Sequence, residues 1–497
     1  MKSTFVSGLG ALLACAVLAS PAHAARLILA ACDQLSLTAD NEPLTDILKL
    51  LAREGVVVKV DQRITTTVTA QFEHLDMEKA IRRIVSPNDF VLVWDVVKGP
   101  LGPIPKLAEV QVFQPGKDKQ LTRLAGPSAR SAPVSVATNL PVLVVPGQVL
   151  VRVKPGTRLS QFKALLARVS GTVVDCFEPS GVYLVRVPKD TDLNALVAEL
   201  RKADIVDAAE PNLVYRIVQP NRETSATGGT PIATSGEKAA GSAAVAVLDS
   251  GLDVSAISSN LITASVDALD PQRPITDPVG HGTQMALIAA GLASPIGVTP
   301  TEGPDPVSIV AVRAFDDNGY ASNFSLLRAV AFAADHGVQV INMSWESSAS
   351  SQFLDEALAC ARAKGIVLVA AAGNAPTGQP VYPAACAGVV AVSALAADGQ
   401  SWDQSNYGDF VTLAAPGFAT FPAASKEQAG LFVGTSISAA FVSRALAEYR
   451  ARHPDATGDQ AVKALVSSLT DAGPAGIDPH YGAGAFDSAA QKRFAAQ

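Results

Sequence analysis

Half of this chain alternates two kinds of apolar segment, and this alternation limits its fold more than any other feature. From Ala243 onward, short runs rich in Val, Ala and Ile recur between longer segments with helical spacing. The short runs read "AAVAVLD", "VSIVAVRAF", "VQVINMS", "GIVLVAAAGN" and "GVVAVSA". Apolar runs of this length, separated by helices, are typical of parallel strands that are buried on both faces. The sequence therefore predicts an α/β fold, a largely parallel sheet with helices on both faces.

Two smaller units are expected before this domain. Residues 33–95 and residues 146–217 each alternate strand patterns with two helical patterns of apolar residues, which predicts two small α+β domains. Residues 96–145 are punctuated by Pro and Gly and are interpreted as a linker. Residues 218–242 are polar with few bulky side chains, which predicts an exposed linker that a protease can cut.

Residues 1–24 have the composition of a secretory signal peptide. Lys2 precedes an apolar stretch that ends in Ala22, His23 and Ala24, a cleavage pattern of small residues. The "LLAC" stretch ending at Cys15 leaves a lipoprotein signal as the alternative. No later segment has the length of a membrane span, so we expect export and no transmembrane segment after signal removal.

Charge and cysteine content narrow the partners and cofactors. From Ala243 onward the sequence has 12 Lys and Arg and 23 Asp and Glu, which gives a charge of −11. Because the whole chain has a charge of −7, the residues before Ala243 carry +4. An acidic C-terminal half argues against nucleic acid as a partner. Cys360 and Cys386 are the candidate disulfide of the exported chain, and the alternative is that both are free buried residues. No Cys or His cluster has metal-ligand spacing, so no metal or cofactor is predicted.

Four polar residues lie directly after strand runs or at helix starts. Asp249 ends "VAVLD", His281 lies between glycines in "GHGT", Asn374 follows "AAAG", and Ser436 precedes an alanine-rich helix in "GTSIS". Each alone has an ordinary explanation as a helix cap, turn or surface residue. Together they supply the nucleophile, the base, the carboxylate that orients the base, and the oxyanion donor of acyl transfer.

These residues lie within stretches that resemble the subtilisin-like serine peptidases, the subtilases. The stretches "VAVLDSG", "GHGT", "VINMS", "AAAGN", "SNYG", "LAAPG", "GTS" and "YGAGAFDSAA" occur in family order over residues 243–490. The resemblance implies that Ser436 is the acylating nucleophile, His281 the general base and Asp249 its orienting partner. It implies that Asn374 joins the Ser436 backbone N–H in the oxyanion hole. It also implies substrate-binding roles for Ser344, Trp345, Glu346, Ala372 and Gly373.

The two smaller units have resemblances of their own. Residues 146–217 resemble the inhibitory pro-region of subtilases, with β-α-β-β-α-β order and the tail "EPNLVYRI". This implies a domain that assists folding, then blocks the cleft, with autocleavage within residues 216–243. Residues 33–95 resemble the short N-terminal domain shared by secretins and TonB-dependent receptors, which implies a periplasmic binding or signalling module.

The chain also departs from the subtilase pattern. Trp345 and Glu346 stand where subtilisins commonly have leucine and glycine, so pocket preferences do not carry over. We expect Trp345 to narrow the non-primed side and Glu346 to favour basic substrate residues. Gln284 and Ala440 replace a histidine and a proline common in the family and leave the triad intact. The short lead-in to Asp249 leaves any calcium site open.

The leading hypothesis is an exported serine endopeptidase, secreted or periplasmic, that is made as an autoprocessed zymogen. It would cut proteins or peptides and be inhibited by its own pro-region. The alternative is a non-cleaving envelope protein in which residues 33–95 bind an envelope partner and the peptidase domain is a scaffold. Natural substrate, mature N-terminus and oligomeric state are left open by the sequence.

Overall fold

The computed structural model describes residues 26–30, 34–53, 56–99, 102–115, 121–123, 142–223, 243–298, 306–421 and 430–497. The predicted signal peptide and Cys32 lie outside these residues. The chain divides into two compact units, one of residues 1–93 and 107–134, the other of residues 94–106 and 135–497. Within the described ranges, no helix is both long enough and apolar enough to span a membrane.

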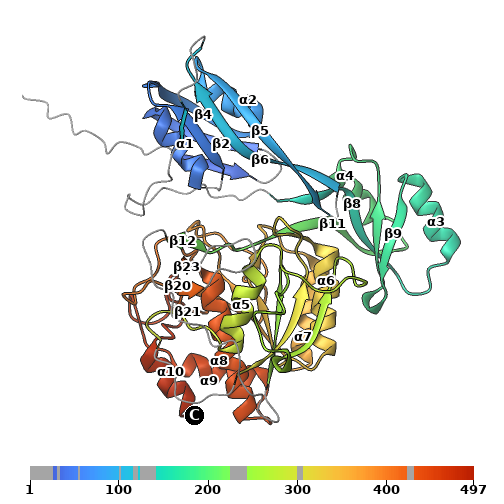
Figure 1. The fold of residues 1–497 in the computed structure, drawn as a ribbon. Helices are drawn as coiled ribbons and strands as arrows, with labels where there is room; N and C mark the ends of the chain where they lie inside the picture. Colours follow the sequence, from blue (N-terminus) through green and yellow to red (C-terminus); the bar gives the residue numbers. More distant parts are fainter. Residues whose placement is uncertain are drawn as a thin grey trace, which may run out of the picture. The chain divides into compact units, whose positions relative to one another are not determined.

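The larger unit is built on a parallel sheet, which has seven strands among the described residues (Figure 1). The strand order is β14-β15-β13-β17-β19-β20-β21, and each neighbouring pair is parallel. Its strands are β13 (Ala244–Asp249), β14 (Ile262–Asp267), β15 (Ser308–Arg313), β17 (Val340–Met343), β19 (Val367–Ala371), β20 (Val389–Leu395) and β21 (Leu413–Pro416). The parallel sheet confirms the predicted fold class.

Helices cover both faces of this sheet because its strands are apolar on both sides. In β13, Val245 and Val247 pack into one core cluster, and Ala246 and Leu248 pack into the other. The first cluster includes residues of α5 (His281–Ala290), α8 (Thr435–Arg452), α9 (Gly458–Ser468) and α10 (Ser488–Ala495). The second includes residues of α6 (Asn323–Asp335) and α7 (Gln352–Ala363). A 3-10 helix, η2 (Ser259–Leu261), precedes β14.

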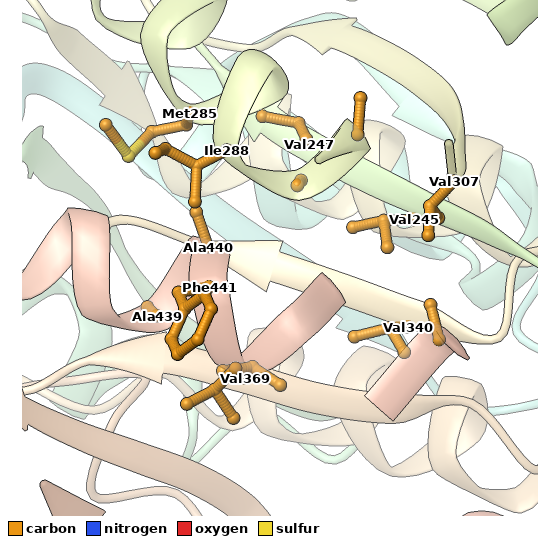
Figure 2. Close-up of a cluster of buried hydrophobic side chains, with 14 of the residues drawn as sticks. Val245, Val247, Met285, Ile288, Val307, Val340, Val369, Ala439, Ala440 and Phe441 are labelled. Carbon is orange, nitrogen blue, oxygen red and sulfur yellow. The ribbon is translucent and has the colours of Figure 1, made fainter. Parts of the chain in front are cut away.

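Helix α8 is buried at its start, where it packs against both the sheet and α5. Its residues 435–443 are all buried, and the small side chain of Ala440 lies next to Ile288 of α5 (Figure 2). A helix with apolar side chains all round is stable only in such a core. This packing brings the polar first turn of α8 to the edge of the sheet.

A β-α-β-β-α-β segment precedes the parallel sheet in the same unit, as predicted. Its elements are β8 (Val144–Val153), α3 (Leu159–Arg168), β9 (Thr172–Phe177), η1 (Glu178–Ser180), β10 (Val182–Arg186), α4 (Leu193–Leu200) and β11 (Val206–Ile217). The antiparallel order is β11-β8-β10-β9. Strand β11 also pairs with β16 (Tyr320–Ser322) and β18 (Trp345–Glu346), so it links this segment to the larger sheet's loops. A small sheet has the order β12 (Asn221–Glu223), β23 (Gly430–Val433), β22 (Phe418–Phe421).

The N-terminal unit contains the expected strands and two helices. Its elements are β1 (Arg26–Ala30), β2 (Gln34–Pro43), α1 (Leu44–Arg53), β3 (Val57–Asp61), β4 (Thr67–Asp76), α2 (Met77–Val85), β5 (Asp89–Gly99), β6 (Gly102–Phe113) and β7 (Leu121–Arg123). They form two sheets, β1-β2-β4 and β5-β6-β3-β7.

The prediction of a linker over residues 96–145 is wrong for its first part. Strands β5, β6 and β7 run through residues 96–99, 102–113 and 121–123, and β6 lies parallel to β3. Leu107, Val110 and Val112 of β6 are buried. Of the Pro and Gly residues that suggested a linker, Gly99 ends β5, and Gly102, Pro103 and Pro105 lie within β6.

The predicted Cys360–Cys386 disulfide is not formed, because both residues are free thiols. Cys360 is exposed on α7, whereas Cys386 packs against the second core cluster. The Cys386 Sγ donates a hydrogen bond to Asp355 Oδ1 at 2.9 Å. Burial, together with the Asp355 carboxylate, raises the pKa of Cys386 well above its usual range.

We expect the two thiols to differ in reactivity. Since the thiolate is the reactive form, the exposed Cys360 should react with a disulfide reagent in the native chain, and Cys386 only after unfolding. Thiol titration of the native and the denatured chain, with Cys360→Ser and Cys386→Ser variants, measures each residue. A bridge would instead keep both unreactive, even after denaturation, until a reductant is added.

Candidate active site

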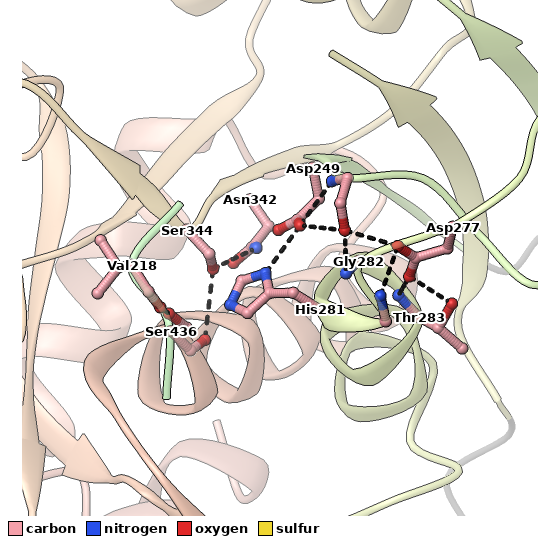
Figure 3. Close-up of polar contacts among 11 residues, drawn as sticks. Val218, Asp249, Asp277, His281, Gly282, Thr283, Asn342, Ser344 and Ser436 are labelled. Atoms are coloured by element: carbon pink, nitrogen blue, oxygen red, sulfur yellow. Dashed lines mark hydrogen bonds and ion pairs between the residues drawn. The ribbon is translucent and has the colours of Figure 1, made fainter. Parts of the chain in front are cut away.

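The four residues predicted to carry the chemistry meet at the carboxyl edge of the parallel sheet. Asp249 is the last residue of β13, His281 the first of α5, and Ser436 the second of α8. Asn374 follows β19. Figure 3 shows the His281 ring between Asp249 and Ser436. Parallel strands end at one edge, which is why residues 187 positions apart, Asp249 and Ser436, come together there.

Asp249 and His281 form a fully buried pair. The His281 Nδ1 lies 2.7 Å from Asp249 Oδ1, and both side chains are 0 % exposed. The backbone N–H of Ser250 also donates to Oδ1, at 2.7 Å. A carboxylate only accepts, so Nδ1 carries the ring proton and Nε2 is the nitrogen that can take one up. The pair therefore orients the ring so that Nε2 lies away from Asp249.

Asp277, which the sequence prediction did not identify, orders the first turn of α5, where His281 lies. Asp277 is buried, and its Oδ1 accepts hydrogen bonds from Ser250 Oγ at 2.7 Å and the Gly280 N–H at 2.8 Å. Its Oδ2 accepts from the backbone N–H and the hydroxyl of Thr283, both at 2.7 Å (Figure 3). A carboxylate at a helix N-terminus satisfies the donors of the first turn. In the sequence, this role is indicated only by the presence of an Asp four positions before His281.

Ser436 and Asn374 lie together through Thr435. The Asn374 Oδ1 accepts from the Thr435 N–H and from its hydroxyl, both at 2.9 Å, and Gly373 N–H donates to the Thr435 hydroxyl at 3.2 Å. These bonds fix which way the Asn374 amide points. Ser436 is in the first turn of α8, where backbone N–H groups have no partner within the helix. Thr435 is a positioning residue that the "GTS" triplet contained but sequence reasoning did not identify.

The chain's own segment beyond β11 runs through this site. Strand β11 pairs antiparallel with β18, with Arg216 opposite Glu346 and Ile217 opposite Trp345. On the other side, β12 pairs antiparallel with β23, which leads into α8. The prediction of an exposed linker is wrong at its start, since Val218 is buried. The segment is thus bound as an added strand on both sides of Ser436.

Between the two strands, the backbone turns at Val218. The Val218 N–H donates to Ser344 O at 3.0 Å, and the Gln219 N–H donates back to Ile217 O at 3.1 Å, which forms a γ-turn. The Ser436 hydroxyl donates to the Val218 carbonyl oxygen. The Asn374 Nδ2 donates to the next carbonyl oxygen, that of Gln219, at 2.8 Å.

The predicted substrate-binding residues divide into three that contact the segment and two that lie behind it. Ser344, Trp345 and Glu346 contact it, through backbone pairing and, for Glu346, an ion pair with Arg216. The Trp345 side chain is fully buried under the strand, edge-on to the Tyr215 ring at 5.3 Å. Ala372 is buried and donates to the sheet, at Val392 O, while Gly373 lies against the Glu346 carboxylate.

The described part of the chain contains no group of three or more His, Cys, Asp or Glu residues that could hold a metal ion.

The fold defines the class as an α/β protein in which Asp249, His281, Asn374 and Ser436 lie at the carboxyl edge of a parallel sheet. Residues 241–484 match the model of the Subtilase family, and residues 133–212 match that of the Fervidolysin N-terminal prodomain. Subtilisin Savinase from Lederbergia lenta is 30% identical over 254 residues, which cover 50% of this chain and 90% of that protein. The chain belongs to the subtilase family.

Other relatives share the same region. The thermophilic serine proteinase of Bacillus sp. (strain AK1) is 29% identical over 310 residues, 60% of this chain and 76% of that protein. Minor extracellular protease Epr of Bacillus subtilis (strain 168) is 32% identical over 249 residues, and the chain spans only 38% of its length. The crystal structure of fervidolysin from Fervidobacterium pennivorans, described as a keratinolytic enzyme related to subtilisin, covers 70% of this chain and 61% of its own. With a TM-score of 0.55 and 22% identity, it shares the fold.

Gly434 is the point where a small change should disturb this geometry. A Cβ at Gly434 would lie 2.9 Å from Asn374 Nδ2 and 3.1 Å from Pro220 Cα. If Asn374 holds the carbonyl of a bound peptide as it holds that of Gln219, Gly434→Ala should lower kcat for peptide hydrolysis by roughly 10- to 100-fold. Steady-state kinetics on the folded variant provide the measurement. An unchanged kcat would show that the amide position does not matter.

Proposed function

We propose that this chain is a serine endopeptidase made as a zymogen that cuts itself. The observation that carries the proposal is the contact of the Ser436 hydroxyl with the Val218 carbonyl, beside an Asn374 amide that binds the carbonyl of Gln219. A peptide that is paired on both sides of a serine hydroxyl is held with its backbone carbonyls beside that hydroxyl.

The proposed reaction begins with attack of Ser436 Oγ on a peptide carbonyl carbon. His281 Nε2 takes the hydroxyl proton, and Asp249 stabilises the imidazolium through its hydrogen bond to Nδ1. The same proton then passes from His281 to the leaving amine as the peptide C–N bond breaks. Water, activated by His281, hydrolyses the acyl ester and regenerates the Ser436 hydroxyl.

Charge on the tetrahedral intermediate requires donors that are already in place. The Asn374 Nδ2 and the Ser436 backbone N–H are assigned this role. Asn374 is oriented by two bonds from Thr435, so it need not rearrange as charge develops. The first turn of α8 adds the positive end of its helix dipole.

The β8–β11 segment is proposed to act as the intramolecular inhibitor. Its anchor is Glu210, whose carboxylate accepts from Asn323 Nδ2 at 2.7 Å, from the Gln352 N–H at 2.9 Å and from the Ser351 hydroxyl, at the starts of α6 and α7. Tyr215 is fully buried in the second core cluster. These contacts keep the segment in the cleft after its peptide bond is cut.

Self-cleavage is assigned to one of two adjacent bonds. The Val218–Gln219 bond follows the carbonyl that contacts Ser436, and the Gln219–Pro220 bond follows the carbonyl that Asn374 binds. The γ-turn at Val218 brings both carbonyls into the site. The mass of the released fragment distinguishes them, since the mature chain would begin at Gln219 or at Pro220.

Active-site labelling tests the proposal. The purified wild-type chain should react with a fluorophosphonate probe as a shortened species, and Ser436→Ala should stay full length and unlabelled. Peptide hydrolysis by that variant should fall about a million-fold, the loss that removal of this serine causes in subtilisin itself. A folded wild type that stays full length and unlabelled would favour the non-cleaving envelope protein instead.

Glu210 makes the hold of the pro-region depend on pH. Burial raises the pKa of Glu210 from its ordinary 4.5 to about 7, against the opposing effect of the Ser351 and backbone donors. A carboxyl group with a raised pKa binds its proton more tightly in the folded chain. Its stabilising contribution is therefore complete below about pH 4.5 and is lost as the pH rises through about 7.

We expect Glu210→Gln to remove this pH dependence. The comparison uses Ser436→Ala, which prevents cleavage, with and without Glu210→Gln. The melting temperature of the double variant minus that of Ser436→Ala should increase as the pH is raised from 5 to 8. The full difference corresponds to about 3 kcal/mol. Parallel melting profiles across this pH range would refute the role of Glu210.

We also propose export and a binding role for the N-terminal module. Export rests on the leader pattern of residues 1–24 and on relatives such as one named an extracellular protease. Residues 33–95 are proposed to bind an envelope partner in the periplasm, as their resemblance to secretin and TonB-dependent receptor domains implies. Mass analysis of the labelled species tests the module, because a targeting role requires that it remain with the active enzyme.

A further inference from the structure

Glu346 is an acidic residue at the substrate cleft. It is the second residue of the two-residue strand β18, and it is only 4 % exposed with the segment in place. Its Oε2 lies 2.5 Å from the point where a Cβ would be on Gly373, the residue before Asn374. The carboxylate is therefore held against the backbone that leads to the proposed oxyanion donor.

The partner of this carboxylate comes from the segment in the cleft. Arg216 Nε and Nη2 donate to Glu346 Oε1 at 2.9 and 2.6 Å. The two residues are also direct neighbours in the β11–β18 pairing, so the backbone sets the distance between their side chains. The Arg216 side chain is 40 % exposed, whereas that of Glu346 is almost fully enclosed.

Release of the segment changes the surroundings of Glu346. A carboxylate that is enclosed by protein is costly unless a cation accompanies it. Arg216 leaves with the pro-region, while Glu346 stays on the cleft wall. A peptide that enters the cleft along β18 encloses the carboxylate again, and a cationic side chain at the Arg216 position restores the ion pair.

We propose that Glu346 makes this enzyme select substrates with Arg or Lys at the position of Arg216, two residues before the residue whose carbonyl contacts Ser436. The inference rests on the proposed peptidase function and adds a substrate class to it. The segment Tyr215–Gln219, Tyr-Arg-Ile-Val-Gln, is then the first example of the preferred sequence.

The negative net charge of the rest of the domain also favours cationic substrates. From Ala243 onward, 12 Lys and Arg are outnumbered by 23 Asp and Glu, a charge of −11. Residues 219–242, which also remain after cleavage, add no net charge, because Arg222 and Lys238 balance Glu223 and Glu237. A negative protein attracts cationic peptides over distances of about a Debye length. Glu346 supplies the contact that decides where along the peptide the positive charge binds.

Internally quenched peptides test the selection on the self-processed wild-type enzyme. One carries Tyr-Arg-Ile-Val-Gln, and the other has citrulline, an uncharged side chain of the same shape, in place of arginine. We expect kcat/KM to be about tenfold higher for the arginine peptide, a size suited to one charge-assisted pair with a partly exposed partner. Added salt should reduce the ratio.

Two variants assign the selection to Glu346. Glu346→Gln should bring the ratio of the two kcat/KM values close to one. Glu356→Gln removes the same charge on α7, outside the cleft, and should keep the tenfold ratio. Because the citrulline comparison uses the wild type, the test does not depend on whether Glu346→Gln matures.

Each outcome has one interpretation. Equal hydrolysis of both peptides overturns the selection by Glu346 and leaves the peptidase proposal standing. A stronger preference for arginine moved to the Val218 position overturns the position assigned here. Hydrolysis of neither peptide, with Ser436 unlabelled, overturns the proposed function as well.

Discussion

The buried hydrogen bond between Asp249 and His281 is the interaction on which the rest of the site depends. A carboxylate at the end of a central strand is costly in the core without donors, and here the imidazole and the Ser250 N–H both contact its Oδ1. The bond joins β13 to the first residue of α5. Asp277 then ties the rest of that turn to Ser250, so the basic nitrogen of His281 has one position.

In our proposals, the same cleft contacts serve both inhibition by the pro-region and recognition of substrates. The segment from Tyr215 to Glu223 uses backbone pairing on both sides of Ser436, which any peptide can make, and one ion pair, which only a cationic residue can make. Backbone pairing gives affinity without sequence preference, whereas an enclosed carboxylate discriminates. An inhibitory tail of this kind is therefore a template for the substrate.

Errors in the sequence interpretation arose where the same residue types occur in two kinds of structure. Pro and Gly near residue 100 indicated a linker, but Gly99 ends β5 and Gly102 begins β6, and the alternating apolar residues of β6 were the better signal. Cys360 and Cys386 were close enough in sequence to suggest a bridge, yet α7 exposes one thiol and the core encloses the other. Thr435 and Asp277 were overlooked because their roles depend on hydrogen bonds with residues far away in the sequence, Asn374 and Gly373 for Thr435 and Ser250 for Asp277.

The sequence by itself determined the α/β class and the resemblance to the subtilases, and it predicted the order of the domains and the roles of Asp249, His281, Asn374 and Ser436. Strand and helix periodicity are local properties, and the four residues lie in short stretches that can be recognised without a fold. Only the tertiary structure decided which carbonyl faces Ser436 and which cation faces Glu346. Those pairings depend on the register between strands far apart in the chain, which is set by packing of the whole domain and not by any local pattern.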